Sequence, residues 1–415
     1  MAREHRVFVR ARTIKTVFEL LRVVLLYSLG DLPLRSIAGW FTGKGQKITD
    51  QAIRWRLKGC TQWLAAIIGQ LLPRVELPLS SGQEKRWQLV IVDTSVVNGP
   101  ATQGTDYRIH LSVDPVRQQM VELQVHDVKT GESLNRFHHD QNQIVLGDRG
   151  FAKAAPLIET HRRGAQFVVR MSPRYLPLFD EAGRKIDLID VLRRAKPQRR
   201  LCLETEIRNP KSGEACRAYV HARRLSIKAG NQARRRARRK AQRRFRRLSA
   251  YTSFLSDWLL ILTSLPPDIL SGDAICELYR VRWQVELVIK RLKSLLDADA
   301  LRVRAGSPLA ELYILGKLLF ALLVENRMMK RVGTECGQMI GPRTMTCWRP
   351  WQLMADEIRE AVLNTLAYDG FDWREMLGVL NERKRKRRLQ VIPEAVAEWL
   401  GERLIQGAIE GAISR

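Results

Sequence analysis

The sequence lacks the marks of a secreted or membrane-spanning protein. Its six cysteines are Cys60, Cys202, Cys216, Cys276, Cys336 and Cys347. None belongs to a C-x-x-C pair, and no two lie at zinc-finger spacing with histidines. The best candidate for a membrane span, residues 16–29, is too short and carries Glu19 and Arg22. The amino-terminal residues lack the apolar segment of a secretory signal. We therefore expect reduced thiols, no membrane partner and a cytoplasmic location.

Acidic residues are scarce relative to basic ones. The 415 residues include 71 Lys and Arg against 43 Asp and Glu, which gives a formal net charge of +28. Hydrophobic residues still make up 45%, so a sizeable core can form, and the length indicates several domains. Such a charge excess suits a polyanion, because each neutralised phosphate releases condensed counterions. Composition therefore predicts a nucleic-acid partner, although it does not by itself predict an enzyme.

One stretch, residues 217–247, contains no acid and includes the run RRRARRKAQRRFRR. Packed charge of one sign cannot lie in a core, so we expect an exposed arm that is disordered or wrapped on DNA, with a solvated helix as the alternative. Such an arm would add affinity and salt dependence but little sequence recognition. Its candidate DNA contacts are Arg234, Arg235, Arg238 and Arg239. A second basic run occupies residues 382–388. For this run and the tail after it, the sequence leaves two roles open, dimerisation and DNA contact.

The first part of the chain, residues 13–75, has apolar residues at helical spacing. A short helix, a Gly-Lys-Gly turn and a second helix capped near Thr49 or Asp50 follow one another there. The second helix carries three cations, Arg54, Arg56 and Lys58. This outline is typical of a helix-turn-helix DNA reader, but any helical bundle with a basic surface gives the same pattern.

After residue 86 the pattern changes to strands. Residues 87–93, 106–114 and 118–127 predict a meander, residues 143–147 and 166–171 predict further strands, and residues 152–163 predict a helix. Such alternation indicates a mixed α/β sheet. Residues 172–257 interrupt it with a predicted strand pair, 200–209 and 215–225, joined by a turn at 210–213. Residues 258–265 resume as a buried strand, and one long helix is expected to begin near Asp273.

Three carboxylates stand out within this pattern. Asp93 and Asp148 each follow an apolar run, where either a site or a turn-forming or helix-capping Asp is expected. Glu286 lies in the long predicted helix. At about 100° per residue, its side of that helix also carries Tyr279, Arg282, Trp283, Lys290 and Lys293, and apolar residues lie opposite. A solvated face with i,i+4 salt bridges would explain the charges but not the two aromatic residues.

A metal site explains more of the pattern. Three carboxylates from two strand ends and a helix can bind a pair of Mg²⁺ ions, which prefer hard oxygen ligands. Two such ions activate an attacking hydroxyl and stabilise the leaving oxygen of a phosphodiester. The neighbouring cations would hold phosphates, and the aromatic rings could stack on bases.

Four residues of this helix fit the pattern Y-x-x-R-x-x-x-E-x-x-x-x-x-x-K: Tyr279, Arg282, Glu286 and Lys293. The pattern resembles the motif of bacterial insertion-sequence DDE transposases of the YREK subgroup. Asp93-Thr-Ser and Asp148-Arg-Gly-Phe are similar to the first and second catalytic segments of that family. The resemblance covers roughly residues 87–323.

This resemblance implies a ribonuclease H-like core, an α/β mixed sheet with helices that a β-rich insertion interrupts, between an all-α amino-terminal domain and a helical carboxyl-terminal region. The expected segments are 1–78 (DNA binding), 86–171 and 258–335 (the two parts of the core), 172–257 (insertion with the Arg-rich arm) and 336–415 (carboxyl-terminal). The implied DNA contacts are Arg149, Tyr279, Arg282, Trp283, Lys290 and Lys293. The implied metal ligands are Asp93, Asp148 and Glu286, with Mn²⁺ able to replace Mg²⁺.

The family's activity follows from the same resemblance. Its members bind terminal inverted repeats, cut both strands, often through a hairpin, and join the 3′ ends to target DNA as a homodimer. In a bacterial cell such a protein would associate with the nucleoid when bound to DNA. Hairpin-forming relatives hold a flipped base on an aromatic residue of the insertion, a role left open here between Trp258 and Tyr251.

Two other hypotheses remain. The chain could be a two-metal DNA nuclease of the same fold without strand transfer, or a non-catalytic DNA-binding regulator derived from a transposase. The presence of all three acids argues against the regulator. Other polar residues are expected to be structural: Asp106, Asp114 and Asp127 as turn residues, and His138 and His139 beside Asp140 as a solvent-facing helix end.

Overall fold

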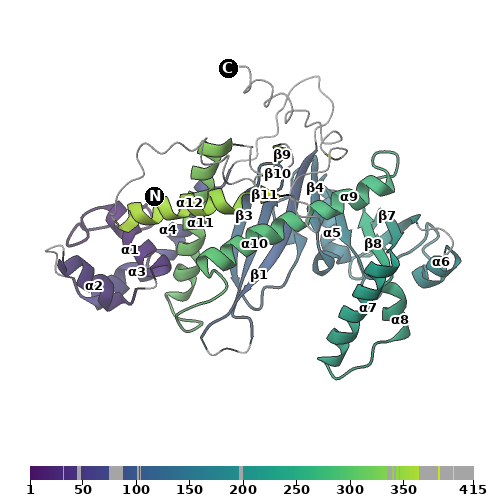
Figure 1. The fold of residues 1–415 in the computed structure, drawn as a ribbon, viewed down its shortest axis with the longest axis horizontal. Helices are drawn as coiled ribbons and strands as arrows, with labels where there is room; N and C mark the ends of the chain where they lie inside the picture. The colour runs from purple at the N-terminus through teal and green to yellow at the C-terminus, as the bar shows by residue number, and fades with distance from the viewer. Residues whose placement is uncertain are drawn as a thin grey trace, which may run out of the picture. The chain divides into compact units, whose positions relative to one another are not determined.

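The computed structural model describes most of the chain. The described residues are 1–30, 32–43, 48–73, 87–100, 102, 104–195, 200–333, 339–340, 343–344, 346–363, 382–383 and 396. Internal contacts divide the chain into two units (Figure 1). Unit 1 comprises Met1–Leu79, Asp93–Gly131 and Trp283–Val391, and unit 2 comprises Ser80–Val92, Glu132–Arg282 and Ile392–Arg415.

The strands form one eight-stranded mixed sheet in the order β3-β2-β1-β4-β5-β8-β7-β6. Their bounds are β1 Gln88–Val97, β2 Tyr107–Asp114, β3 Gln119–Asp127, β4 Gln143–Gly147, β5 Gln166–Arg170, β6 Arg200–Arg208, β7 Ala215–Arg224 and β8 Trp258–Thr263. β4 pairs in parallel with β1 and β5, and all five of its residues are buried. A continuous apolar run is what a central parallel strand requires. The remaining recorded pairs, β2–β3, β5–β8, β8–β7 and β7–β6, are antiparallel. The predicted α/β mixed sheet is thus confirmed.

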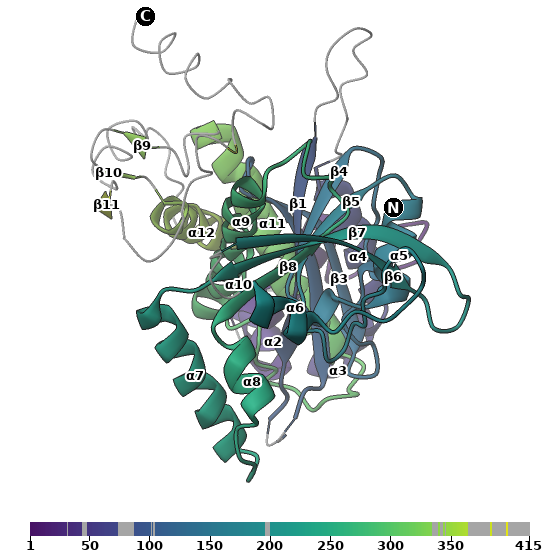
Figure 2. The ribbon, with the colours of Figure 1, turned by 90° about the vertical axis from the view of Figure 1, so that its right-hand side faces the viewer.

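Unit 2 holds five helices among the described residues, α5 (Ala154–Arg162), α6 (Leu188–Arg194), α7 (Ile227–Gln242), α8 (Ala250–Leu255) and α9 (Gly272–Val281), with a 3-10 turn at Arg149–Phe151. α9 packs on β5, β7 and β8, and α5 packs on β5, β6 and β7. α7 and α8 lie side by side as a helical hairpin (Figure 2).

Unit 1 is mainly helical. Its helices are α1 (Val17–Leu29), α2 (Leu34–Gly43), α3 (Asp50–Lys58), α4 (Thr61–Leu71), α10 (Trp283–Leu296), α11 (Ala310–Val332) and α12 (Trp348–Leu363). α11 is buried on nearly every side and contacts α1, α4, α10 and α12, as its apolar sequence predicts. A side chain at Gly316 would collide with Ser28, so this glycine permits the close approach of α1. Short strands Met339–Ile340, Arg343–Thr344 and Glu382–Arg383 pair as β9, β10 and β11.

Three expectations about local structure were wrong. β1 continues to Val97, so Asp93 lies within a strand rather than at its end. The long predicted helix is two helices that meet at Arg282, where the backbone stays in the right-handed helical region with φ −49° and ψ −29°. Helix α9 packs on strands of unit 2, and α10 packs on α11 of unit 1. The segment 172–257 contains α6, α7 and α8 in addition to its two strands, so it is not mainly β. Its basic arm is exposed, as expected, and forms the helix α7, which was the alternative to a disordered arm.

Several remaining expectations concern thiols, membranes and the tail. Cys60, Cys202, Cys216, Cys276 and Cys347 are free thiols, and Cys336 lies outside the described residues. Over the part of the chain that the structure describes, no helix is long and apolar enough to cross a bilayer. Most of the second basic run and the tail after it also lie outside the described residues.

Candidate active site and basic helix

Asp148 occupies the end of β4 in unit 2. It is half-buried, and its Oδ1 accepts a hydrogen bond of 2.7 Å from the amide of Gly150. Asp148 therefore caps the turn Arg149–Phe151, as the structural interpretation of this residue predicts. The capping bond uses one lone pair of one oxygen, which leaves most of the acceptor capacity of the carboxylate for a ligand.

A second carboxylate, Glu132, lies beside the same turn. A Cβ atom built on Gly150 would come 3.0 Å from Asp148 Oδ1 and even closer to Glu132 Oε2. Gly150 thus leaves space that two carboxylates share, and any larger residue would displace one of them. Lys153, which follows the turn, donates to the Glu132 carbonyl at 2.6 Å.

Three guanidinium groups, those of Arg149, Arg170 and Arg282, interact near the end of β5 in unit 2. Burial lowers the pKa of Arg170, and Arg149 and Arg282 lower it further. Asp148 and Tyr279 oppose that shift, so Arg170 interacts with each of these four groups. Cations packed this closely repel each other unless an anion lies among them. The cluster is therefore suited to a phosphate group.

Tyr279 belongs to the same cluster. Burial raises the pKa of its hydroxyl, and Arg282 and Arg170 partly offset the increase. The Arg282 guanidinium carbon lies 5.9 Å from the centre of the Tyr279 ring. The hydroxyl therefore stays protonated near pH 7, where it can donate a hydrogen bond. The structure thus brings Tyr279 near Asp148 and Arg282 near Tyr279, although the sequence separates Asp148 from both by more than a hundred residues.

Asp93 lies in unit 1, in the part of β1 that follows the pairing with β4. It is half-buried, and its Oδ1 accepts a hydrogen bond of 2.8 Å from the amide of Thr94. The end of β1 is bonded to the segment after α10: Asn98 donates to the Asp299 carbonyl and accepts from Leu301, both at 2.9 Å. These bonds attach the strand carrying Asp93 to the segment that follows the helix carrying Glu286.

α10 carries the remaining predicted site residues. Val285, Val288 and Leu292 form its buried face, as predicted. The other face carries Trp283, Glu286, Lys290 and Lys293, of which Lys290 is exposed and the other three are half-buried. The Lys293 ammonium lies 3.6 Å from an Asp299 oxygen, and the Lys290 ammonium lies 5.4 Å from the centre of the Trp348 ring. The stripe predicted around Glu286 is therefore present on α10, whereas Tyr279 and Arg282 precede it on α9 and the turn.

The fit of the three acids to a metal ion rests on their donor atoms. Asp93, Asp148 and Glu286 offer carboxylate oxygens, the ligand type that hard divalent cations prefer. Within the described ranges no three His, Cys, Asp or Glu side chains gather at metal-ligand distance. Asp93 and Glu286 belong to unit 1, and Asp148 belongs to unit 2.

The other acidic candidates are turn residues, as expected. Asp106 accepts from the Gly99 amide, Asp114 accepts from the amides of Val116 and Arg117, and Asp127 accepts from the Thr130 hydroxyl. The expectation for His139 was wrong, because it is buried and bonded to the Leu134 carbonyl instead of facing solvent. Burial lowers its pKa to about 4, so it is neutral near pH 7.

Helix α3 lies where the sequence predicts the second helix of a helix-turn-helix. Thr49 caps it by accepting from the Ala52 amide, as the sequence predicts. Ile53 and Leu57 are buried, and α3 packs on α2. Its exposed face carries Trp55, 73% exposed, with the Lys58 ammonium 5.2 Å from the ring centre. A protruding aromatic among cations suits contact with a nucleic acid.

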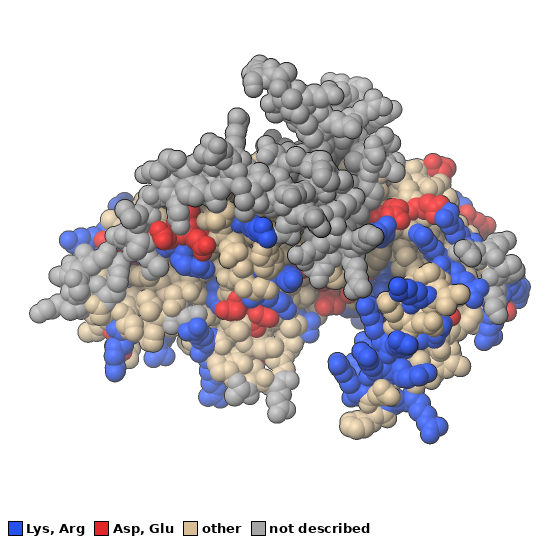
Figure 3. Space-filling model, in the orientation of Figure 1, with Lys and Arg blue, Asp and Glu red and all other residues tan. Residues whose placement is uncertain are grey.

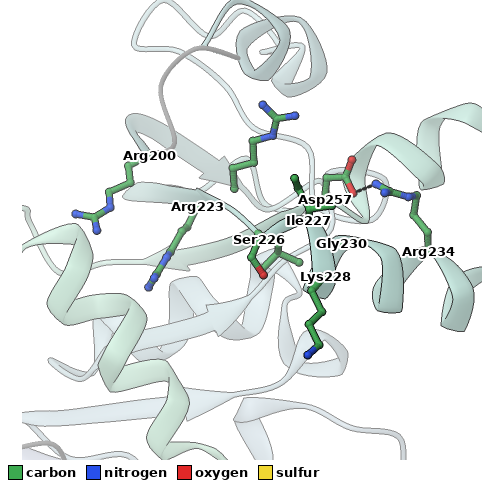
Figure 4. Close-up of a pocket in the computed structure, with 10 residues that line it drawn as sticks. Arg200, Arg223, Ser226, Ile227, Lys228, Gly230, Arg234 and Asp257 are labelled. Carbon is green, nitrogen blue, oxygen red and sulfur yellow. Dashed lines mark hydrogen bonds and ion pairs between the residues drawn. The ribbon is translucent and has the colours of Figure 1, made fainter.

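α7 forms a second basic surface. Figure 3 shows Lys and Arg side chains gathered over this helix, and Gly230 is its one buried residue. Arg235, Arg238 and Arg239 are exposed, as predicted. Arg234 differs from them, because it forms an ion pair with Asp257 (Figure 4). It also donates a hydrogen bond of 2.6 Å to Asn231.

A cavity of about 770 Å³ lies beside the start of α7. It is lined by Arg200, Arg223, Arg224, Leu225, Ser226, Ile227, Lys228, Gly230, Arg234 and Asp257 (Figure 4). Ser226 caps α7, so the positive end of the helix dipole is also directed here. Asp273 pairs with Arg200, and Glu277 lies 3.8 Å from Arg223, so acidic groups already offset part of the charge.

The two aromatic residues considered for holding a base have different environments. Trp258 begins β8 and is 3% exposed, so its ring lies inside the core and cannot receive a base. Tyr251, on α8, is 38% exposed. Burial raises the pKa of its hydroxyl.

Comparison with known proteins agrees with this arrangement. Residues 88–322 match the family described as "Transposase DDE domain". That range is more than half of the chain and includes Asp93, Asp148 and Glu286. The chain therefore belongs to the DDE transposase family.

Two named relatives indicate which kind of DDE transposase this chain is. The InsL protein of insertion sequence element IS186A from Escherichia coli (strain K12) is 30% identical over 330 residues, which are 78% of this chain and 88% of that protein. The transposase for insertion sequence element IS421 from Escherichia coli is 30% identical over 331 residues, with the same two coverages. The protein is thus a DNA transposase of the bacterial insertion-sequence type, a metal-dependent enzyme that cleaves and transfers DNA strands.

The sequence interpretation missed two residues next to Asp148. Arg170 ends an apolar strand, and a cation at the end of a buried strand carries the same signal that singled out Asp148. Glu132 had no such signal, because it lies in a polar loop with Gly131 and Ser133. Only the folded turn at Gly150 brings it near Asp148.

Proposed function

We propose that Asp93, Asp148 and Glu286 jointly bind two Mg²⁺ ions, which Mn²⁺ can replace, and so form the catalytic centre of the transposase. The observation that carries this proposal is the register of β1 and β4, in which Ile91 lies beside Leu146. Continuing each strand by two residues aligns Asp93 with Asp148. Metal binding would then require Glu286 of α10 to approach both.

The chemistry divides between the metal ions and the chain. Bound divalent ions would activate the attacking hydroxyl and stabilise the leaving oxygen of the phosphodiester. The chain orients the DNA: Arg149, Arg170 and Arg282 surround the phosphate position beside Asp148, and Tyr279 donates a hydrogen bond there. On α10, Lys293 contacts a phosphate near the transposon end, and Trp283 and Lys290 lie near the bound strand. Lys293 would exchange its Asp299 partner for a phosphate.

A separate surface supplies affinity without sequence recognition. Arg235, Arg238 and Arg239 of α7 contact phosphates of the duplex, and Arg234 joins them when it leaves Asp257. Helix α3 enters the major groove of the inverted repeat, with Arg54 and Lys58 on its exposed face.

The proposed architecture and reaction follow the family. Residues 86–171 and 258–335 form a ribonuclease H-like core around the insertion 172–257, residues 1–78 bind DNA, and 336–415 form a helical carboxyl-terminal region. A homodimer pairs two terminal inverted repeats, cuts both strands through a hairpin, and joins the ends to target DNA. The enzyme acts on the chromosome in the bacterial cytoplasm.

A single-turnover assay on inverted-repeat DNA tests the proposed centre. Glu286→Gln should abolish Mg²⁺-dependent cutting while leaving DNA binding intact, because the substitution removes a ligand charge and keeps the shape. If the variant cuts at the parental rate, the assignment of Glu286 is wrong. If the parent cuts but never joins ends to target DNA, the chain is a nuclease. If the parent binds without cutting under any divalent ion, the chain is a regulator.

A further inference from the structure

Phe245 lies in the turn between α7 and α8 and is packed against no other described residue. Its side chain is 100% exposed, which no other large hydrophobic residue among those described equals. Burial therefore gives no reason for an aromatic residue at this position. A polar residue would lower the risk of aggregation at such a tip.

The backbone conformation at this position favours glycine over phenylalanine. Phe245 has a φ of 53°, in the left-handed region. The Arg246 amide donates to the Ala241 carbonyl and the Phe245 amide donates to the Gln242 carbonyl, each at 2.9 Å. These two bonds define a Schellman motif with Phe245 at the position that glycine usually occupies. Phenylalanine is strained there, so local stability also fails to explain the ring.

The charges around the ring indicate its partner. Arg243, Arg244, Arg246 and Arg247 are all exposed, and within the described residues none of them has an ion-pair partner. α7 continues this positive surface through Arg238 and Arg239. The guanidinium groups would bind phosphates, and the apolar ring between them would contact stacked apolar rings. The expected partner is therefore a polyanion in which phosphates lie beside stacked rings. Duplex DNA has that chemistry.

We propose that Phe245 stacks against a base step of duplex DNA held along α7 and locally unstacks it. The inference rests on the proposed contact between α7 and DNA. The arginines on either side fix the backbone, and the left-handed turn directs the ring away from the hairpin toward the bases. The arm would thereby deform the duplex that it binds in addition to attracting it.

The test compares three full-length variants on duplex DNA carrying 2-aminopurine at successive positions. Phe245→Gly removes both ring and strain, and it should weaken DNA binding about tenfold and abolish the 2-aminopurine fluorescence increase. Its thermal unfolding temperature should be equal to or higher than that of the parent. Phe245→Tyr should retain binding and fluorescence. Tyr175→Ala, which removes another exposed aromatic beside an arginine, is the matched control and should change neither.

Several outcomes would overturn the proposal. Unchanged binding and fluorescence in Phe245→Gly would show that the ring does not meet DNA. A lower unfolding temperature would show a structural role. Loss of binding to anionic vesicles, with DNA binding unchanged, would assign the ring to a membrane surface. A triple variant with Arg235, Arg238 and Arg239 replaced by Ala distinguishes the proposed role of Phe245 from the proposed role of α7. If this variant binds DNA like the parent, the proposed role of α7 fails as well.

Discussion

α7 and α10 are both basic helices of similar length, yet they differ in what surrounds their charges. α7 has 16 residues, no acid and one buried position. α10 has 14 residues, six of them buried, and carries Glu286 among its cations. One helix projects charge into solvent, and the other is held against the core by one face.

The two helices are therefore expected to have different roles: α7 attracts DNA, and α10 contributes to catalysis. Exposed guanidiniums on α7 can neutralise phosphates anywhere along a duplex, so they add affinity that salt weakens. A carboxylate fixed on a packed helix can keep the geometry that a metal ion demands. Substitutions in α7 should therefore change binding, and substitutions in the carboxylate set should change catalysis.

The largest effect is expected from the two strand-borne acids. Asp93→Asn or Asp148→Asn should each slow cleavage of bound inverted-repeat DNA by roughly 10³-fold or more, because a lost ligand removes several kcal/mol of transition-state stabilisation. Quenched-flow cleavage at saturating DNA measures this rate. Asp127→Asn, which alters an acid of a surface turn, is the control and should cut normally. A modest loss in either site variant would argue for a role in capping instead of metal binding.

The next effect should appear in salt dependence. Replacing Arg235, Arg238 and Arg239 with Ala should reduce the slope of log K against log[salt] by about 2 to 3, since each phosphate contact contributes roughly 0.9. Fluorescence anisotropy across a salt series measures the slope. Arg184→Ala, at an exposed arginine paired with Asp180, should leave it unchanged. An unaltered slope in the triple variant would mean that α7 does not contact the backbone.

A smaller effect is expected at Lys293. Lys293→Ala should weaken binding of inverted-repeat DNA by about tenfold and leave the Mg²⁺ concentration for half-maximal rate unchanged, because one charge-assisted phosphate contact is lost. Asp299→Asn should instead strengthen binding slightly, since it frees Lys293 from its partner. A shift in metal dependence without loss of binding would contradict the phosphate role.

The last effect concerns the buried face of α10 and changes stability instead of DNA binding or cleavage. Arg291 of this helix interacts with Glu325 of α11, where burial raises the carboxyl pKa from 4.5 to about 7. The folded chain therefore holds that proton more tightly than the unfolded chain, so stability decreases as pH rises through this interval. Glu325→Gln imitates the protonated acid. Urea unfolding should show the variant gaining about 2 kcal/mol relative to the parent between pH 5 and pH 8. Parallel pH profiles would contradict the assignment.

The strands and the motif could be predicted because their signals are local. Apolar runs located β1, β4, β5 and β8, and fixed spacing along one helix located Glu286. The end of β1 could not be predicted, because Asp93 and Thr94 suggest a loop while pairing in the sheet extends the strand to Val97. The break between α9 and α10 at Arg282 could not be predicted either, because no proline or glycine marks it in the sequence.

The parts of the site that escaped prediction depend on tertiary contacts. Arg170 and Asp148 lie close because β4 and β5 are parallel neighbours, a pairing that the sequence does not specify. Phe245 had a local signal, an aromatic residue within an arginine run. Its significance emerges only with the left-handed turn and the complete exposure that the structure shows.

Iron-mediated cleavage of the protein backbone tests the central claim most directly. Fe²⁺ substituted for the divalent ions, with hydrogen peroxide as oxidant and ascorbate to regenerate the ferrous ion, would generate hydroxyl radicals that cut the chain beside each metal ligand. With inverted-repeat DNA bound, cuts should appear together next to Asp93, Asp148 and Glu286, and excess Mg²⁺ should suppress all three. Cuts at only one of these segments, or cuts that Mg²⁺ does not suppress, would show that the three carboxylates do not share a metal centre.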